Sequence, residues 1–406
     1  MPQTLPRLRL SLDFMPSPAP DRPGLLIRDP YRYSDATLIV PPPLVAGLQC
    51  FDGEQTDLDL RKYLVDLTGD LDVGELQQHL IDALSEAGFL EDENFARLRE
   101  RRHREFAESP VRAPSHAGGA YPGEAGPLRQ TLTNYMQGAA GPAAADGLIG
   151  IAAPHVSPFG GWESYRAAYG AMPAQLAGRT FVILGTSHYG EPERFGLTRK
   201  SFVTPYGTAQ TDTALVDTLA GRGGEAVRME DYCHAVEHSI EFQVVFLQHL
   251  YGPDIRIVPI LCGPYATSIY RGGAPEDNDN VKRFLGALGE LAEREKHRLF
   301  WVLGIDMAHM GRRYNDTFPA AADQGEMQEV AARDRERIGR MSAADVQGFW
   351  ELVQEKHDDL KWCGSSPIYT FLKAVPDAQG KLEQYQQWNI DPQSVVTFAG
   401  MTFRRE

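Results

Sequence analysis

The stretch TFVILGTSHYG, residues 180–190, decides the fold, because an apolar run of strand length passes directly into a polar turn. Four further apolar runs of similar length occur along the chain: GLIGIAAP (147–154), IRIVPILCG (255–263), RLFWVLGID (298–306) and SVVTFAGMTF (394–403). Segments with helical spacing separate these runs. Near-continuous apolar strands that alternate with helices are typical of a parallel sheet covered on both faces. We therefore predict an α/β fold for residues 111–406, with a mainly parallel central sheet flanked by helices.

The region before this sheet has a different character. Residues 1–22 are rich in Pro and Arg and lack periodicity, which predicts an irregular leader. Short strand-like runs followed by helical periodicity predict a small helical domain over residues 23–92, with a two-stranded wing. Residues 93–110 are almost all charged or polar and predict a solvated linker helix. Within the larger domain, a Gly/Ala-rich loop is expected around residues 138–146.

The overall composition limits the classes of partner and compartment. Lys and Arg number 40 against 55 for Asp and Glu, and the formal net charge of −15 disfavours nucleic acid and anionic membrane surfaces as partners. The N-terminus lacks an apolar secretory segment, and no stretch reaches the roughly 18 apolar residues of a membrane span, so we expect a cytoplasmic protein. The four cysteines form no C-x-x-C pair, which argues against a disulfide framework or a zinc knuckle.

Polar residues follow three of the predicted strands at the point where each strand ends. The first run ends at His155, the second at Ser187, His188 and Tyr189, and the fourth at Asp306 and His309. Sites in open α/β sheets form just beyond the carboxyl ends of the strands, so we expect these side chains on one edge of the sheet. Two further groups join them as candidates: His234, Glu237, His238 and Ser239 at the start of a predicted helix, with the two histidines one turn apart, and Cys363 at a Gly/Pro-marked turn.

Each of these residues also has a purely structural interpretation. A single histidine at a strand end is usually a solvated loop residue or a satisfied core residue, and a free cysteine such as Cys262 is usually a small buried hydrophobe. Residues 237–239 can alternatively form a helix-start capping arrangement, in which the macrodipole favours Glu237. The coincidence of several strand ends in His beside Gly, Ser or Pro favours a functional site.

A cluster of histidines with a carboxylate or a thiolate indicates a metal site. Imidazole ligands suit iron, zinc, copper or nickel, and a thiolate shifts the preference toward softer ions, so the residue types alone leave the metal open. Such a site can bind O2 or activate water, while a histidine that is not a ligand moves the proton.

Taken together, the motifs resemble the Memo family, the B component of the AmmeMemoRadiSam system. The resemblance covers about 290 residues from position 112 onward, and it rests on RAPSHAGGAYPG (112–123), AAPH (152–155), GTSHYG (185–190), HAVEHSIEFQVVFLQ (234–248), VPILCG (258–263), DMAHMGRRY (306–314), CGSSPI (363–368) and SVVTFAGMTF (394–403). The segment AAPHVSPFGGW departs from the family, which more often has a glycine and an aromatic residue soon after this histidine.

The resemblance implies a fold similar to that of class III extradiol, LigB-type, non-haem iron dioxygenases. It implies His155 and His188 as metal ligands, and Cys363 in the place where those dioxygenases use a glutamate. His309 matches their acid/base histidine, with His238 and Glu237 beside it in the catalytic cleft. Asp306 is implied as an additional contact near the metal, and the residues expected to line the cleft are Ser187, Tyr189, His234 and Ser239. Iron(II) is the implied cofactor, with copper or zinc as alternatives; the glutamate-to-cysteine change puts ring cleavage in doubt because a thiolate is itself oxidisable.

The N-terminal segment has a separate resemblance. VPPPLVAGLQCFDGEQTDLDLRKYL (40–64), followed by LIDALSEAGFLED (80–92), resembles the PqqD-like winged-helix modules that hold peptide substrates for modifying enzymes. The resemblances imply a small-molecule or peptide substrate, and radical SAM and AMMECR-type proteins as system partners. They favour a non-haem iron oxygenase or redox enzyme; the alternatives are a non-catalytic module that binds a peptide or an anion at a vestigial metal site, and a zinc-dependent hydrolase.

Overall fold

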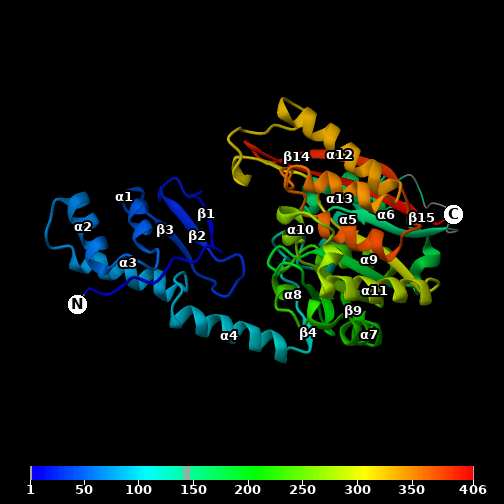
Figure 1. Ribbon diagram of the computed structural model, residues 1–406, viewed down its shortest axis with the longest axis horizontal. Helices are drawn as coiled ribbons and strands as arrows, with labels where there is room; N and C mark the ends of the chain where they lie inside the picture. The colour runs from blue at the N-terminus through cyan, green and yellow to red at the C-terminus, as the bar shows by residue number, and fades with distance from the viewer. Residues whose placement is uncertain (1, 140, 142–146, 406) are drawn as a thin grey trace. The chain divides into compact units, whose positions relative to one another are not determined.

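The computed structural model describes residues 2–139, 141 and 147–405, and the chain divides into two compact units, Met1–Ser109 and Pro110–Glu406 (Figure 1). Most of the Gly/Ala-rich loop expected around 138–146 lies outside the described residues. In the first unit, one antiparallel sheet in the order β1-β2-β3 packs with helices around a core that includes Ile27, Leu60 and Leu84. The elements of this unit are β1 (Asp13–Pro16), β2 (Leu25–Arg28), β3 (Thr37–Val40), α1 (Pro42–Val45), α2 (Asp57–Thr68), α3 (Gly74–Glu86) and α4 (Glu93–Glu108).

The prediction of an irregular leader over residues 1–22 is wrong for Asp13–Pro16, which form strand β1. Strand β1 lies in this segment and pairs with β2, so the sheet has three strands where a two-stranded wing was expected. Leu5 and Leu12 are buried, and Arg9 forms a buried ion pair with Asp29 at 3.0 Å. Separate contacts hold the segment in place: two buried leucines and one ion pair. Because these residues do not form one regular face of a helix or strand, the sequence shows no periodicity here.

The second unit is built on a large mixed sheet (Figure 1). All five predicted runs form strands: β5 (Leu148–Ala153), β6 (Thr180–Thr186), β11 (Arg256–Cys262), β12 (Leu299–Gly304) and β15 (Ser394–Arg404). Strands β5, β12, β6 and β11 are neighbours in this order and run parallel, as predicted. Strand β15 differs from the predicted parallel arrangement, because it pairs antiparallel with β5 and with β14 (Gln379–Asp391). Its apolar residues fit a buried strand of either direction. The short turn between β14 and β15 makes these two strands antiparallel.

Helices cover both faces of this sheet, as the continuous apolar runs predict. In β6, Val182 and Leu184 belong to the core shared with α7, α11, α12, α13 and α14, whereas Phe181 and Ile183 belong to the core shared with α5, α6 and α9. The helices are α5 (Ala125–Met136), α6 (Pro158–Tyr169), α7 (Thr213–Gly223), α8 (Cys233–Val236), α9 (Glu241–Tyr251), α10 (Ala266–Arg271), α11 (Asp279–Arg294), α12 (Glu326–Ser342), α13 (Val346–Gln354) and α14 (Ser365–Ala374). Because successive strand side chains alternate between faces, one apolar strand supplies both cores.

Shorter strands extend the sheet at its margins. They are β4 (Val111–Arg112), β7 (Phe195–Leu197), β8 (Ser201–Thr204), β9 (Gly207–Thr211), β10 (Val227–Met229) and β13 (His309–Gly311). Among the described residues, no helix combines the length and the apolar content needed to cross a lipid bilayer.

Candidate metal centre

The carboxyl ends of three neighbouring strands bring candidate residues together. His155 follows β5, Asp306 follows β12 and His188 follows β6. Because β12 lies between β5 and β6, the loop that carries Asp306 lies between the two loops that carry the histidines. This is the edge where open α/β sheets form their sites.

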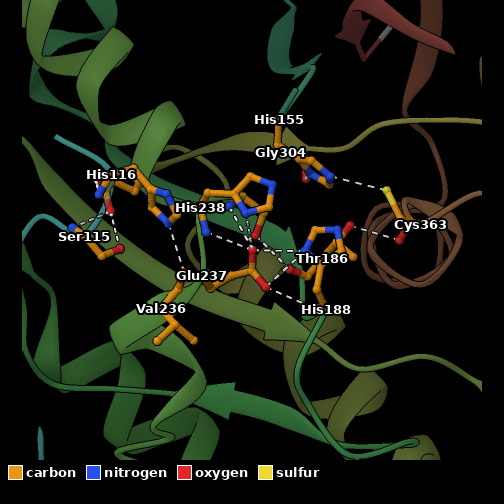
Figure 2. Close-up of polar contacts among 12 residues, drawn as sticks. Ser115, His116, His155, Thr186, His188, Val236, Glu237, His238, Gly304 and Cys363 are labelled. Carbon is orange, nitrogen blue, oxygen red and sulfur yellow. Dashed lines mark hydrogen bonds and ion pairs between the residues drawn. The ribbon is translucent and has the colours of Figure 1, made fainter. Parts of the chain in front are cut away.

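A third histidine, His238, completes a cluster with His155 and His188 (Figure 2). Each of the three offers one ligand atom, and these atoms all lie within 4.8 Å of one another. The ring centroids of His155 and His188 are 4.9 Å apart, and those of His155 and His238 are 5.1 Å apart. The structure therefore groups His238, which the resemblance placed beside the catalytic histidine, with the two expected ligands.

The Nδ1 atom of each histidine faces an oxygen acceptor. His155 Nδ1 lies 2.9 Å from the carbonyl oxygen of Gly304. The Nδ1 atoms of His188 and His238 lie 3.0 and 3.1 Å from the same oxygen, Oε1 of Glu237. A hydrogen bond from Nδ1–H leaves the lone pair of a neutral imidazole on Nε2, which is how acceptors behind metal-binding histidines set their tautomer. All three rings are thus prepared to coordinate through Nε2.

Glu237 is the buried carboxylate that organises this cluster. Besides the two imidazoles, it accepts hydrogen bonds from the backbone N–H groups of His188 at 2.9 Å, His238 at 2.8 Å and Ser239 at 3.2 Å. Burial alone would raise the pKa of Glu237, but His188 and then His238 lower it well below its usual range. Burial likewise works against a charged His188, but Glu237 and Cys363 raise the pKa of His188 well above its usual range.

The expectation that His234 and His238 lie one turn apart on a helix is wrong. Helix α8 ends at Val236 and α9 begins at Glu241, with Glu237 in an extended conformation between them. The backbone N–H groups of His238 and Ser239 donate to the Glu237 side chain, and the chain leaves the helical conformation at this point. His234 consequently does not line the cluster: its Nε2 lies 3.0 Å from the carbonyl oxygen of Gly196.

The other three residues expected to line the cleft differ in what they contact. Ser239 is buried and its hydroxyl donates to the carbonyl oxygen of Thr186 at 2.8 Å, so it fastens the His238 turn to the end of β6. Ser187 lines a small cavity beside His188. The ring of Tyr189 lies 6.2 Å from that of His188.

Cys363 and Asp306 lie against His155. The Cys363 sulfur is 3.3 Å from His155 Nε2, and burial raises the pKa of this thiol (Figure 2). Asp306 Oδ2 is 3.5 Å from the same nitrogen, while Oδ1 accepts the backbone N–H of His155 at 2.9 Å. Burial also raises the pKa of Asp306. A thiol and a carboxyl group therefore stand next to the lone-pair side of the His155 ring.

His309 follows β12 near the cluster. Its Nδ1 lies 2.9 Å from the carbonyl oxygen of Met307 and 3.1 Å from that of Lys361, which leaves Nε2 as the acceptor atom. Burial lowers the pKa of His309 to about 4. A histidine that is neutral at pH 7 can accept a proton from a nearby group.

Two supporting residues, Arg112 and His116, escaped the sequence reasoning. Arg112 is fully buried, pairs with Glu241 and donates to the carbonyl oxygens of His234 and Glu237, both at 2.7 Å. His116 packs edge-on against His238 with ring centroids 5.5 Å apart (Figure 2). Arg112 and His116 both belong to the family-like element RAPSHAGGAYPG, which was the one signal in the sequence for them.

Comparisons with known proteins agree on one family. The family described as Memo-like protein matches residues 112–402. A MEMO1 family protein of Aquifex aeolicus is 26% identical over 382 residues, which cover 93% of this chain and 95% of the relative. MEMO1 family proteins of Desulfurococcus amylolyticus and Thermococcus kodakarensis are 27% and 28% identical, and the matches cover 67% and 62% of this chain and 89% and 86% of the relatives. Since Pro110–Glu406 is about three quarters of the chain, the match to the Aquifex protein extends into the first unit.

Proposed function

Because this chain belongs to the Memo-like protein family, we propose that it is a metalloprotein that holds iron(II) through Nε2 of His155, His188 and His238. The observation that carries this proposal is the set of Nδ1 contacts, since one backbone carbonyl and one carboxylate orient three imidazoles toward a common point. Relative to the ligand set implied by resemblance, His238 becomes the third imidazole ligand. Cys363 becomes a further donor, beside His155.

The donor atoms of this site fit iron(II). Imidazole suits iron, copper and zinc, and a nearby thiol favours a softer or redox-active ion over magnesium or calcium. Glu237 adds one negative charge directly behind two of the ligands, which offsets the charge of a bound cation. Bound iron(II) supplies one-electron redox chemistry with O2 when coordination positions stay open.

The residues around the centre have separate tasks in this proposal. His309, which is neutral at pH 7, accepts a proton from a substrate hydroxyl or from water. Glu237 holds the two imidazoles in one orientation throughout. We propose O2-dependent oxidation of a small molecule as the reaction class.

Metal content tests the proposal directly. The full chain, purified anaerobically without a metal-affinity tag, is expected to contain close to one iron per chain by inductively coupled plasma mass spectrometry. Cys363→Ala is expected to retain less iron, because it loses a donor beside His155 but keeps all three imidazoles. Cys50→Ala, a buried cysteine of the first unit, is the matched control and should keep the wild-type iron content.

Two results would contradict this proposal. Stoichiometric zinc without iron, together with no O2 consumption, would favour a hydrolase. Absence of any metal from the wild-type protein would favour a binding module.

A further inference from the structure

A cavity of about 280 Å³ adjoins the proposed metal centre, and His188 and Cys363 form part of its wall. The volume corresponds to roughly nine water molecules at about 30 Å³ each, and it lies just below the range of drug-sized ligand pockets. Trp362 and Ile269 supply apolar wall area. The cavity therefore suits a small molecule with an apolar body.

Lys361 brings a positive charge to the wall of this cavity. Lys361 Nζ contacts Asp316 Oδ1 at 2.8 Å and the carbonyl oxygen of Asp359 at 3.4 Å, and an ammonium group has three protons to donate. Asp358 also lines the cavity, but Arg337 compensates its charge at 2.7 Å. Lys361 is thus the cationic side chain of this wall that has donor capacity left for a ligand.

An unpartnered hydroxyl lies on the same wall. Ser366 is 5% exposed, lines the cavity, and its Oγ has no hydrogen-bond partner among the described residues. The neighbouring Ser365 differs, because its hydroxyl donates to the carbonyl oxygen of Trp362 at 2.8 Å. Both serines begin helix α14, whose ten residues direct a partial positive charge toward this end.

These observations point to one class of ligand. We propose that the cavity binds the carboxylate of a small organic acid, with Lys361 and Ser366 as the anion contacts; the inference rests on the proposed function, for which it supplies the substrate class. A carboxylate on these two donors places the apolar body of the acid along Trp362, next to His188 and Cys363. Asp316 is the acid in contact with Lys361, and this contact leaves a proton of the ammonium group for a ligand.

The test uses the metal-free full chain and benzoate as the probe, with binding measured by isothermal titration calorimetry. We expect benzoate to bind, and we expect Lys361→Met to weaken this binding about tenfold or more, since a charged hydrogen bond is lost. Lys361→Arg should preserve binding, and Ser366→Ala should weaken it by roughly threefold to tenfold. Lys381→Met, at an exposed lysine of β14, is the matched control and should bind as the wild type does.

The outcome that overturns the proposal is equal benzoate affinity in wild type and Lys361→Met, or no benzoate binding by the wild type. Neutral benzamide binding as tightly as benzoate would also overturn it. Phenyl phosphate binding more tightly than benzoate would overturn the carboxylate assignment in favour of a phosphate ester. Because the titration is done without metal, its failure leaves the metal assignment standing, and failure of the metal assignment leaves the benzoate result standing.

Discussion

Replacing Arg112 with alanine is expected to destabilise the Pro110–Glu406 unit by about 3–5 kcal/mol, because it leaves the carboxylate of Glu241 buried without a counter-ion. The change also removes the donors to the carbonyl oxygens of His234 and Glu237, two buried acceptors in the segment that leads to His238. Chemical denaturation of the full chain, followed by a probe of this unit, measures the loss. Weaker iron retention should accompany it, since the turn that carries His238 loses its support.

Two matched variants separate this effect from a general effect of losing an arginine. Arg199→Ala removes the arginine of an exposed ion pair with Asp217 in the same unit and should cost no more than about 1 kcal/mol. Arg112→Met combined with Glu241→Gln removes both charges and should recover part of the stability. A loss below about 1 kcal/mol for Arg112→Ala would contradict the role given to the buried pair.

The pH dependence of stability should follow from the same pair. Burial alone would raise the pKa of Glu241, but Arg112 overcomes this effect and lowers the pKa to about 2. The stabilisation is therefore present above the unfolded-state pKa of about 4.3 and is lost as the pH falls toward 2. The difference between wild type and Arg112→Ala should narrow over that interval.

Glu237→Gln should weaken iron(II) binding by about 10- to 100-fold, the usual range for the loss of a partner that orients a metal ligand. The Glu237 carboxylate uses both of its oxygens to accept from two imidazoles and three backbone N–H groups, whereas an amide has one acceptor oxygen and no negative charge. Competition with a chromogenic iron(II) chelator measures the affinity. Glu230→Gln, which alters a carboxylate paired with Lys200 in the same unit, is the matched control and should bind as the wild type does.

The same variant should change how iron affinity depends on pH. In the metal-free protein Glu237 and Cys363 raise the pKa of His188, so at pH values below that pKa a proton must leave His188 before Nε2 can coordinate. Wild-type affinity should therefore rise about tenfold per pH unit as long as the pH is below that pKa. In Glu237→Gln the pKa falls and the slope should flatten; an unchanged slope would contradict the proton-linked role of Glu237.

The strands could be predicted because a strand buried on both faces must be apolar at every position, and that pattern is visible in one sequence. The direction of β15 could not, since apolar residues do not record whether a neighbour runs parallel or antiparallel. The ordered contacts of the N-terminal segment could not be predicted for a related reason. Leu5, Arg9 and Leu12 are held by separate long-range partners, so the sequence shows no periodic pattern.

The site was predictable in part. His155 and His188 follow strands, and parallel neighbours bring their ends together whatever the loops contain. His238 comes from a turn between two helices, and its position depends on the amides and imidazoles that Glu237 gathers. The buried Arg112 depends on a partner 129 residues away in the sequence, which no local pattern reveals.

The measurement that tests the central claim most directly is the iron content of a variant that carries both His155→Ala and His188→Ala. Its matched control is His249→Ala, which removes a half-buried histidine of α9 that contacts Tyr206. With two of three imidazole ligands gone, the double variant should contain almost no iron after anaerobic purification, while the control retains the wild-type amount. Full iron occupancy in a folded double variant would contradict the claim that these histidines hold the metal.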